Sequence, residues 1–183
     1  MGDLFLLSCS ECGYSKHLSL GCGMFYFFTY DNTVQAAKDG TYGETYRTFF
    51  REHPDGAINA EHVIMKCDSC GEYDDPKDLS LYVPKGNMDI PEKVKRCPWL
   101  WDLIRYYKKV IQFQHVCKRC GGKLHIFRTD ETKDDDEPPV YVRSENGVRP
   151  DGHKSDASIS QHPQPFICPN CKKALTVRLG NFD

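Results

Sequence analysis

The chain has 183 residues, of which 39% are hydrophobic and 27% charged, with ten cysteines and a formal net charge of −2. This composition supports a modest core, and small domains usually need metals or disulfides as staples. No run of 18 apolar residues occurs, and the apolar run at residues 4–7 is too short for a signal peptide. We therefore expect a cytoplasmic protein without a membrane-spanning helix, in which paired cysteines bind metal more often than they form disulfides.

The first half of the chain predicts short strands with helical inserts. Strand patterns occur at residues 4–7, 18–20, 24–29, 62–66 and 79–83. Residues 32–53 carry apolar side chains at helical spacing, broken at Gly40 and Gly43. Residues 84–87 form a turn cluster.

The second half begins with an expected amphipathic helix. Apolar residues recur at i, i+3, i+4, i+7 and i+11, namely Leu100, Leu103, Ile104, Tyr107 and Ile111. Tyr107 lies on this apolar stripe and is expected in the core. Residues 123–128 and 174–179 alternate like strands, and residues 129–165 are expected to be an acidic, partly disordered loop with a short strand at 140–143. The fold class predicted is α+β.

Four cysteine pairs share the spacing Cys-x-x-Cys, and we call each pair with its turn a knuckle. The pairs are Cys9/Cys12, Cys67/Cys70, Cys117/Cys120 and Cys168/Cys171. Two intervening residues let a tight turn aim both thiolates and nearby backbone amides at one cation. Glycine follows three of the pairs and permits the positive φ that closes such a turn, whereas Lys172 follows the fourth.

Four such pairs predict two closed Cys₄ sites holding two Zn²⁺ ions. Iron uses the same ligand set and is less favoured. A catalytic zinc keeps an open position and usually includes His or carboxylate ligands, and none of the seven histidines lies in a His-x-Glu or His-Glu-x-x-His motif. We therefore expect no enzyme, and a metal-dependent enzyme is the weakest alternative.

Two of the knuckles resemble those of zinc-ribbon proteins: Cys9-Ser10-Glu11-Cys12-Gly13-Tyr14 and Cys117-Lys118-Arg119-Cys120-Gly121-Gly122. The resemblance covers about a third of the chain. It implies a zinc-stabilised β-hairpin scaffold, which in relatives binds nucleic acid or protein. The inserts are tens of residues longer than in a compact ribbon, so no function is carried over.

Sequential pairing of the knuckles, first with second and third with fourth, is the favoured arrangement, and an interleaved one is its rival. It predicts two zinc-ribbon-like β-hairpin modules with helical inserts and small cores stapled by metal. The first spans residues 1–90 and the second residues 117–183. Residues 91–116 connect them as an amphipathic helix and strand.

Residues 91–128 are the strongest functional candidate, because ten Lys/Arg against two Asp/Glu give them a net charge of +8. Aromatic residues alternate with these cations, and the two together bind phosphates and stack on bases. The candidate nucleic-acid contacts are Arg96, Arg105, Lys108, Lys109, Lys118, Arg119, Lys123 and Arg128. Two zinc-bound Cys₄ sites would lower the net charge of the whole chain to about −6, which disfavours strong non-specific nucleic-acid binding.

The first expectation is therefore a zinc-binding interaction module that contacts another protein, and nucleic-acid binding is the alternative. The sequence specifies neither the partner nor the oligomeric state. Cys22 and Cys97 are left outside the knuckles and are expected to be buried, inert thiols.

Overall fold

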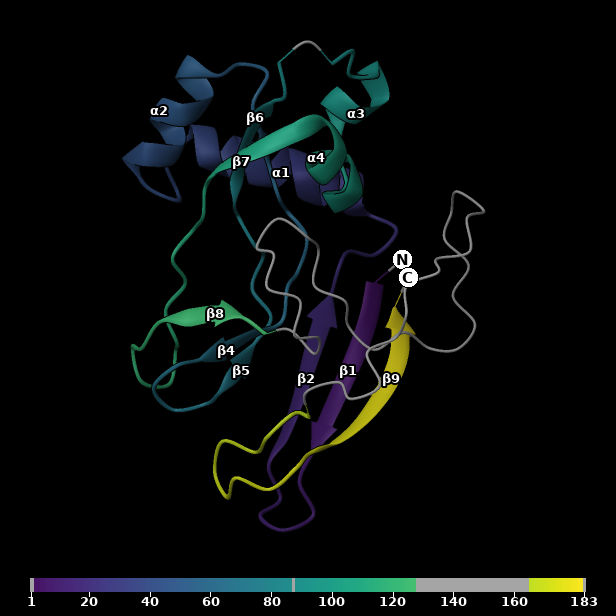
Figure 1. Cartoon of the computed structure of the whole chain (residues 1–183), viewed down its shortest axis with the longest axis vertical. Coiled ribbons are helices and arrows are strands. Elements are labelled where there is room, and N and C mark those ends of the chain that lie inside the picture. Colours follow the sequence, from purple (N-terminus) through teal and green to yellow (C-terminus); the bar gives the residue numbers. More distant parts are fainter. Residues whose placement is uncertain (1, 87, 128–164, 183) are drawn as a thin grey trace.

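A computed structural model describes residues 2–86, 88–127 and 165–182, which form an α+β fold of three small antiparallel sheets and four helices (Figure 1). The predicted loop at 129–165, with its strand at 140–143, falls outside the described residues except at position 165. The helices are α1 (Tyr26–Lys38), α2 (Glu44–Glu52), α3 (Glu92–Arg96) and α4 (Leu100–Tyr106). The strands are β1 (Gly2–Ser8), β2 (Ser15–Leu20), β3 (Ala57–Ile58), β4 (Met65–Cys67), β5 (Tyr73–Asp74), β6 (Leu81–Pro84), β7 (Tyr107–Ile111), β8 (Leu124–Ile126) and β9 (Thr176–Phe182).

The longest sheet has the order β2-β1-β9 and joins the two ends of the chain. β1 and β2 form a hairpin around the first knuckle, and β9 pairs with the other edge of β1 in a register from Gly2 opposite Phe182 to Ser8 opposite Thr176. The two termini consequently lie side by side (Figure 1). Phe5, Leu7 and Leu18 turn their side chains into a buried core.

The second sheet, β3-β6-β7, is covered by helices on both faces. Neighbouring residues of β6 point to opposite faces, as the pleat of a strand requires. Leu81 packs in a core with the buried aromatic residues of α1 and α2, whereas Tyr82 packs in another core with residues of α3 and α4. This helical part forms one end of the molecule, and the longest sheet extends away from it (Figure 1).

The third sheet, β5-β4-β8, is the smallest and carries the second and third knuckles. Lys66 in β4 pairs with Tyr73 in β5 and with His125 in β8. Tyr73 contacts Phe127 and Phe166, and Phe166 in turn contacts Phe5 of the longest sheet. One core thus joins the longest sheet to the smallest.

The first difference from the predicted elements concerns residues 24–29, where the expected strand is wrong. Tyr26 begins α1, whose buried residues Tyr26, Tyr30, Thr33 and Ala37 follow the i, i+4, i+7, i+11 spacing of a helix face. The prediction failed because the solvent side of this first turn carries Phe25 and Phe28. Because both the buried and the exposed side of this turn carry apolar residues, the sequence does not show the alternation that marks an amphipathic helix.

The second difference is the length of the predicted helix after Pro98. α4 ends at Tyr106, and Tyr107 has the extended angles φ −124° and ψ 159°. Residues 107–111 alternate between inward and exposed side chains and pair with β6, so Tyr107 and Ile111 reach the core from a strand. Tyr107 is buried as expected.

The remaining predicted strands and the helical insert are present with shifted bounds. β4 covers only the last two residues of the strand expected at 62–66, because His62 forms isolated bridges with Gly21 and Lys77. Gly40 and Gly43 both have positive φ where the insert breaks between α1 and α2. None of the described helices has the length and apolar character needed to cross a bilayer.

Candidate metal centres

The eight knuckle cysteines gather in two groups of four. One group contains Cys9, Cys12, Cys168 and Cys171, and the other contains Cys67, Cys70, Cys117 and Cys120. Within each group all four Sγ atoms lie within 4.8 Å of one another. Both groups have two buried cysteines, one half-buried and one exposed, so each site lies just beneath the surface. Among the described residues these groups contain no His or carboxylate ligand.

The four groups of turn residues adopt one backbone geometry. In every knuckle the N–H of the first cysteine donates to the carbonyl five residues later, at 2.7–2.8 Å. The N–H four residues after that cysteine donates back to its carbonyl, at 2.8–3.1 Å. The residue at this fourth position has positive φ in each case: Gly13 71°, Gly71 75°, Gly121 73° and Lys172 63°. The glycines therefore serve the turn as the sequence predicts, and Lys172 adopts the same conformation despite its Cβ.

The sulfur positions fit a tetrahedral cation. Across the first group the Sγ atoms of Cys9 and Cys171 are 3.4 Å apart and those of Cys12 and Cys168 are 3.5 Å apart. Across the second group the distances are 3.5 Å between Cys67 and Cys120 and 3.7 Å between Cys70 and Cys117. A Zn–S bond of about 2.3 Å gives a tetrahedral S–S edge of about 3.8 Å, close to these values. All ten cysteines are free thiols, so the groups are not pairs of disulfides.

Backbone amides prepare one sulfur of each group to be a thiolate. The N–H of Cys70 is the main cause that lowers the pKa of Cys67 to about 6. Burial raises the pKa of Cys168, but the N–H groups of Cys171 and Asn170 outweigh it and bring the pKa to about 7. These are the amides that the knuckle turn directs at its sulfurs.

In each group, at least one other sulfur has a raised pKa and holds its proton more tightly. The N–H of Glu72 lowers the pKa of Cys70, but burial and the three neighbouring thiols raise it to about 12. Cys12 shows the same balance, with a pKa of about 12. Four thiolates at one place repel one another, and a divalent metal ion bound between them would supply the positive charge that offsets this repulsion.

The pairing of the knuckles is nested, so the expected sequential pairing is wrong. The first knuckle shares a site with the fourth, and the second shares a site with the third. The strands explain this order, because β9 follows the fourth knuckle and pairs with β1, which precedes the first. Likewise β8, after the third knuckle, pairs with β4 at the second. The domain bounds at residues 90 and 117 stay a prediction.

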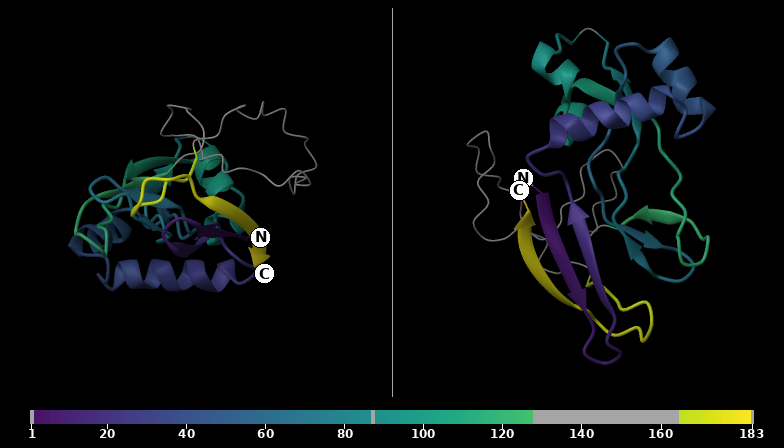
Figure 2. Two further views of the ribbon diagram at one scale, coloured as in Figure 1. Left: turned by 90° about the horizontal axis from the view of Figure 1, so that it is seen from below. Right: turned by 180° about the vertical axis from the view of Figure 1, so that it is seen from behind.

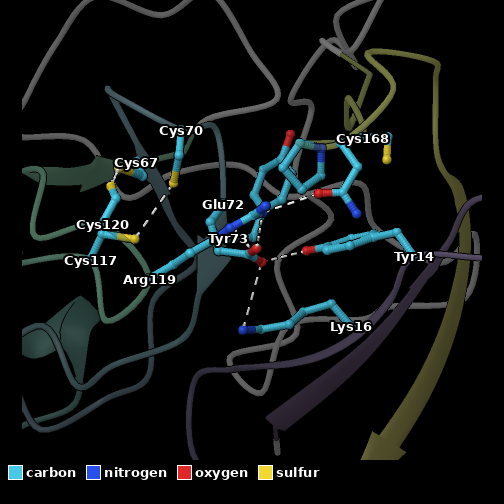
Figure 3. A network of polar contacts seen from close by, with 12 residues as sticks. Tyr14, Lys16, Cys67, Cys70, Glu72, Tyr73, Cys117, Arg119, Cys120 and Cys168 are labelled. Carbon is cyan, nitrogen blue, oxygen red and sulfur yellow. Dashed lines mark hydrogen bonds and ion pairs between the residues drawn. The ribbon is translucent and has the colours of Figure 1, made fainter. Parts of the chain in front are cut away.

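Glu72 connects all four knuckles through polar contacts (Figure 3). It follows the second knuckle, and its carboxylate accepts a hydrogen bond from Tyr14 Oη of the first knuckle at 2.6 Å. Arg119 Nη1 of the third knuckle lies 3.1 Å from the same carboxylate and 3.1 Å from Asn170 Oδ1 of the fourth. Lys16 Nζ is a more distant partner, at 3.8 Å. The two cysteine sites are thus joined by one ion-pair network.

Sequence reasoning did not identify this junction. Tyr14 and Glu72 each stand two positions after the second cysteine of a knuckle, and Arg119 and Asn170 each stand directly before it. The repetition of polar residues at matching positions of different knuckles is the feature of the sequence that could have indicated these contacts. Their partners follow only from the nested pairing, which the sequence does not reveal.

The predicted nucleic-acid contacts are spread over several elements. Arg96 belongs to α3, Arg105 to α4, and Lys108 and Lys109 to β7. Lys118 Nζ lies 3.2 Å from Asp74, and Arg119 is held by Glu72, so two of the knuckle cations already have acidic partners. Lys123 forms an isolated bridge with Val116 just before β8, and Arg128 lies outside the described residues.

The two cysteines outside the knuckles lie near one another in the core beneath α1. Cys22 is buried and Cys97 is half-buried. Burial raises the pKa of Cys22 well above its usual range, and burial with nearby carboxylates raises the pKa of Cys97 to about 11. Both thiols therefore stay protonated at neutral pH, as inert core residues do.

Comparison of the chain with known protein families, curated proteins and solved structures finds no match. The two Cys₄ groups remain consistent with zinc-ribbon-like knuckles, and the assignment of function depends on the site itself.

Proposed function

We propose that this chain binds two structural Zn²⁺ ions and acts as a non-catalytic interaction module. The observation that carries the metal assignment is the gathering of eight cysteines, from four distant segments, into two groups with near-tetrahedral sulfur spacing. Four-sulfur sites with tetrahedral geometry suit zinc, and iron is the rival for the same ligands.

The ligand set supports a structural role. A catalytic zinc keeps a position open for water or substrate, whereas four thiolates close the coordination sphere. Each site also joins two segments that are far apart in the sequence: the β1–β2 turn with the turn before β9, and the turn between β4 and β5 with the turn before β8. A metal ion in each site would add on the order of 10 kcal/mol of folding free energy at neutral pH.

The metal assignment is tested by elemental analysis of the purified protein. We expect two zinc ions per chain by mass spectrometry of the metal content, and one in the double variant Cys9→Ala/Cys168→Ala. Complete chelation should abolish the near-UV circular dichroism signal and unfold the chain. Two iron ions per chain, or native near-UV and far-UV spectra after complete metal removal, would contradict the proposal.

Interaction with another protein is proposed as the task of this scaffold, and nucleic-acid binding is the competing task. Lys118 and Arg119 are neutralised by Asp74 and Glu72 at the knuckles, where zinc-ribbon-like hairpins would present cations to a phosphate backbone. This contact pattern favours a structural use of those two cations. Salt-dependent binding to DNA or RNA at low ionic strength is the measurement that would reverse the preference.

A further inference from the structure

A cluster of large apolar side chains is exposed where α1 and α4 begin. Met24 is 74% exposed, Phe25 64%, Phe28 63% and Trp101 59%, and Trp99 beside them is 40% exposed. We call these five residues the aromatic patch. Both ribbon views place the start of α1 next to α3 and α4 (Figure 1, Figure 2). Soluble proteins rarely leave several large apolar side chains exposed together unless the surface binds something.

The patch is held on a rigid base. The Trp99 ring packs on Tyr26, with ring centroids 4.5 Å apart, and the buried Tyr26 Oη donates to the Pro98 carbonyl at 2.9 Å. Glu61 is buried and accepts the N–H of Leu100 at 2.7 Å, which fixes the start of α4. The Trp99 ring and the start of α4 are therefore held in place before any partner arrives, which lowers the entropic cost of binding.

Three cations border this patch, and none of them has an acidic partner among the described residues. The Arg96 guanidinium lies over the Phe27 ring at 4.5 Å, and Lys93 stands three residues earlier on the same face of α3. Arg105 stands four residues after Trp101 on the same face of α4. Within the described part of the chain, none of the ion pairs includes Lys93, Arg96 or Arg105. The knuckle cations Lys118 and Arg119, in contrast, are paired.

We propose that the aromatic patch docks an acidic segment of a partner protein that carries large apolar anchors. The apolar side chains of that segment would cover Phe25, Phe28 and Trp101, and its carboxylates would pair with Arg96 and Arg105. Aromatic residues, Met and Arg are the side chains enriched in protein interfaces. The inference goes beyond the proposed function, since it names the surface and the chemistry of the partner.

The arrangement of the rings favours protein over single-stranded nucleic acid. Bases stack on aromatic faces that stand open beside a row of cations. Here Phe27 and Phe28 meet edge to face at 77°, Phe27 is already covered by Arg96, and Trp99 already packs on Tyr26. Three bordering cations would also neutralise few phosphates.

A peptide-display selection on the zinc-loaded full chain tests the proposal. The probe is a library of random 16-residue peptides, and the zinc content of the bait is measured first so that a failed metal site is recognised separately. We expect enriched peptides with Asp or Glu around Trp, Phe or Leu. Their affinity should fall about tenfold or more in Phe28→Ser/Trp101→Ser, as expected for interface hot spots, and about threefold or more in Arg96→Gln/Arg105→Gln.

Matched control variants distinguish binding at the aromatic patch from non-specific binding elsewhere on the surface. Val116→Ser changes a side chain that is 61% exposed before the third knuckle, and Arg51→Gln removes an exposed cation on α2. Both should leave peptide affinity, zinc content and thermal stability unchanged. The proposal is overturned if enriched peptides lack acidic residues, if none is enriched, or if they bind the patch variants as well as the parent. Patch-dependent binding of a dT₁₂ or rU₁₂ oligonucleotide instead of peptides, or patch-dependent self-association by sedimentation, would also overturn it.

Discussion

At the scale of single residues, the fourth knuckle differs from the other three at one backbone position. Lys172 has φ 63°, where the other knuckles have glycine. A residue with a Cβ costs about 1–2 kcal/mol in this left-handed conformation. The Lys172 side chain offsets part of that cost, because its Nζ donates to the Pro169 carbonyl at 2.9 Å.

Replacing Lys172 by glycine should therefore stabilise the zinc-loaded protein. We expect Lys172→Gly to raise the free energy of unfolding by about 0.5–1 kcal/mol, since the relieved strain exceeds the added flexibility of the unfolded chain. The reverse change, Gly13→Ala in the first knuckle, should lower it by about 1 kcal/mol, because the space around Gly13 is open and only its φ opposes alanine. Guanidinium denaturation with zinc present measures both. A destabilised Lys172→Gly would mean that the Pro169 contact outweighs the strain.

The Glu72–Arg119 ion pair is the second residue-scale feature that experiment can isolate. Glu72 is 15% exposed and Arg119 49%, so solvent weakens their attraction only in part. A double-mutant cycle with Glu72→Ala and Arg119→Ala should give a coupling energy of about 0.5–1 kcal/mol in unfolding.

The exposed pair Glu44–Arg47 on α2 is the matched control for this cycle. Its two side chains are 67% and 50% exposed, and its coupling energy should be at most about 0.5 kcal/mol. Equal coupling energies in the two cycles would show that the Glu72–Arg119 ion pair stabilises the fold no more than an exposed surface pair does.

At the scale of elements, local patterns predicted the strands that flank the knuckles and the helical insert with its break at Gly40 and Gly43. They failed where an element's solvent face is apolar, as in the first turn of α1. They failed again at α4, because Leu100, Leu103 and Tyr107 satisfy a helical spacing while Tyr107 also starts an alternating run. Residues 107–111 form a strand because they pair with β6, and a contact between segments so far apart in the sequence cannot be predicted from the local pattern.

Leu103 tests the packing of α4 against the second sheet. It is fully buried, in a core with Val94, Tyr82 and Tyr107. Leu103→Ala should lower the free energy of unfolding by about 3 kcal/mol, through lost apolar contact and the cavity left behind. Trp101→Ala on the exposed face of the same helix should change it by less than about 1 kcal/mol. Similar losses in the two variants would contradict the orientation of α4.

At the scale of the whole molecule, the nested order makes each Cys₄ group a link between distant parts of the chain. The sequence shows that eight cysteines suffice for two sites, and this prediction needs only their spacing. It does not show which knuckles meet, because any two of them supply the same four sulfurs. The partner of each knuckle is chosen by strand pairing, β1 with β9 and β4 with β8.

Because the Glu72 network and the Tyr73–Phe166 contact join the two centres, emptying one should weaken the other. We expect Cys9→Ala/Cys168→Ala to keep one zinc ion, and to release it to a chelator several-fold faster than the parent protein releases either of its ions. Stopped-flow release to a chromophoric chelator measures the rates.

Cys22→Ala removes a buried cysteine that is no ligand, and it should keep two zinc ions released at the parental rate. An unchanged release rate in the Cys9→Ala/Cys168→Ala variant would indicate that the two centres act independently. The reciprocal variant, Cys67→Ala/Cys117→Ala, asks the same question of the other centre.

We expect the nested pairing also to set the order in which the two sites assemble during synthesis. The inner centre is complete once Cys120 has left the exit tunnel, whereas the outer one must wait for Cys168 and Cys171, 48 and 51 residues later. At synthesis rates of about 5–20 residues per second, this leaves roughly 2–10 s in which the nascent chain would be able to bind the first proposed ion but not the second. During that interval the partner of the first knuckle has not yet been exposed. The second and third knuckles can then form their four-sulfur site without competition from the cysteines of the fourth.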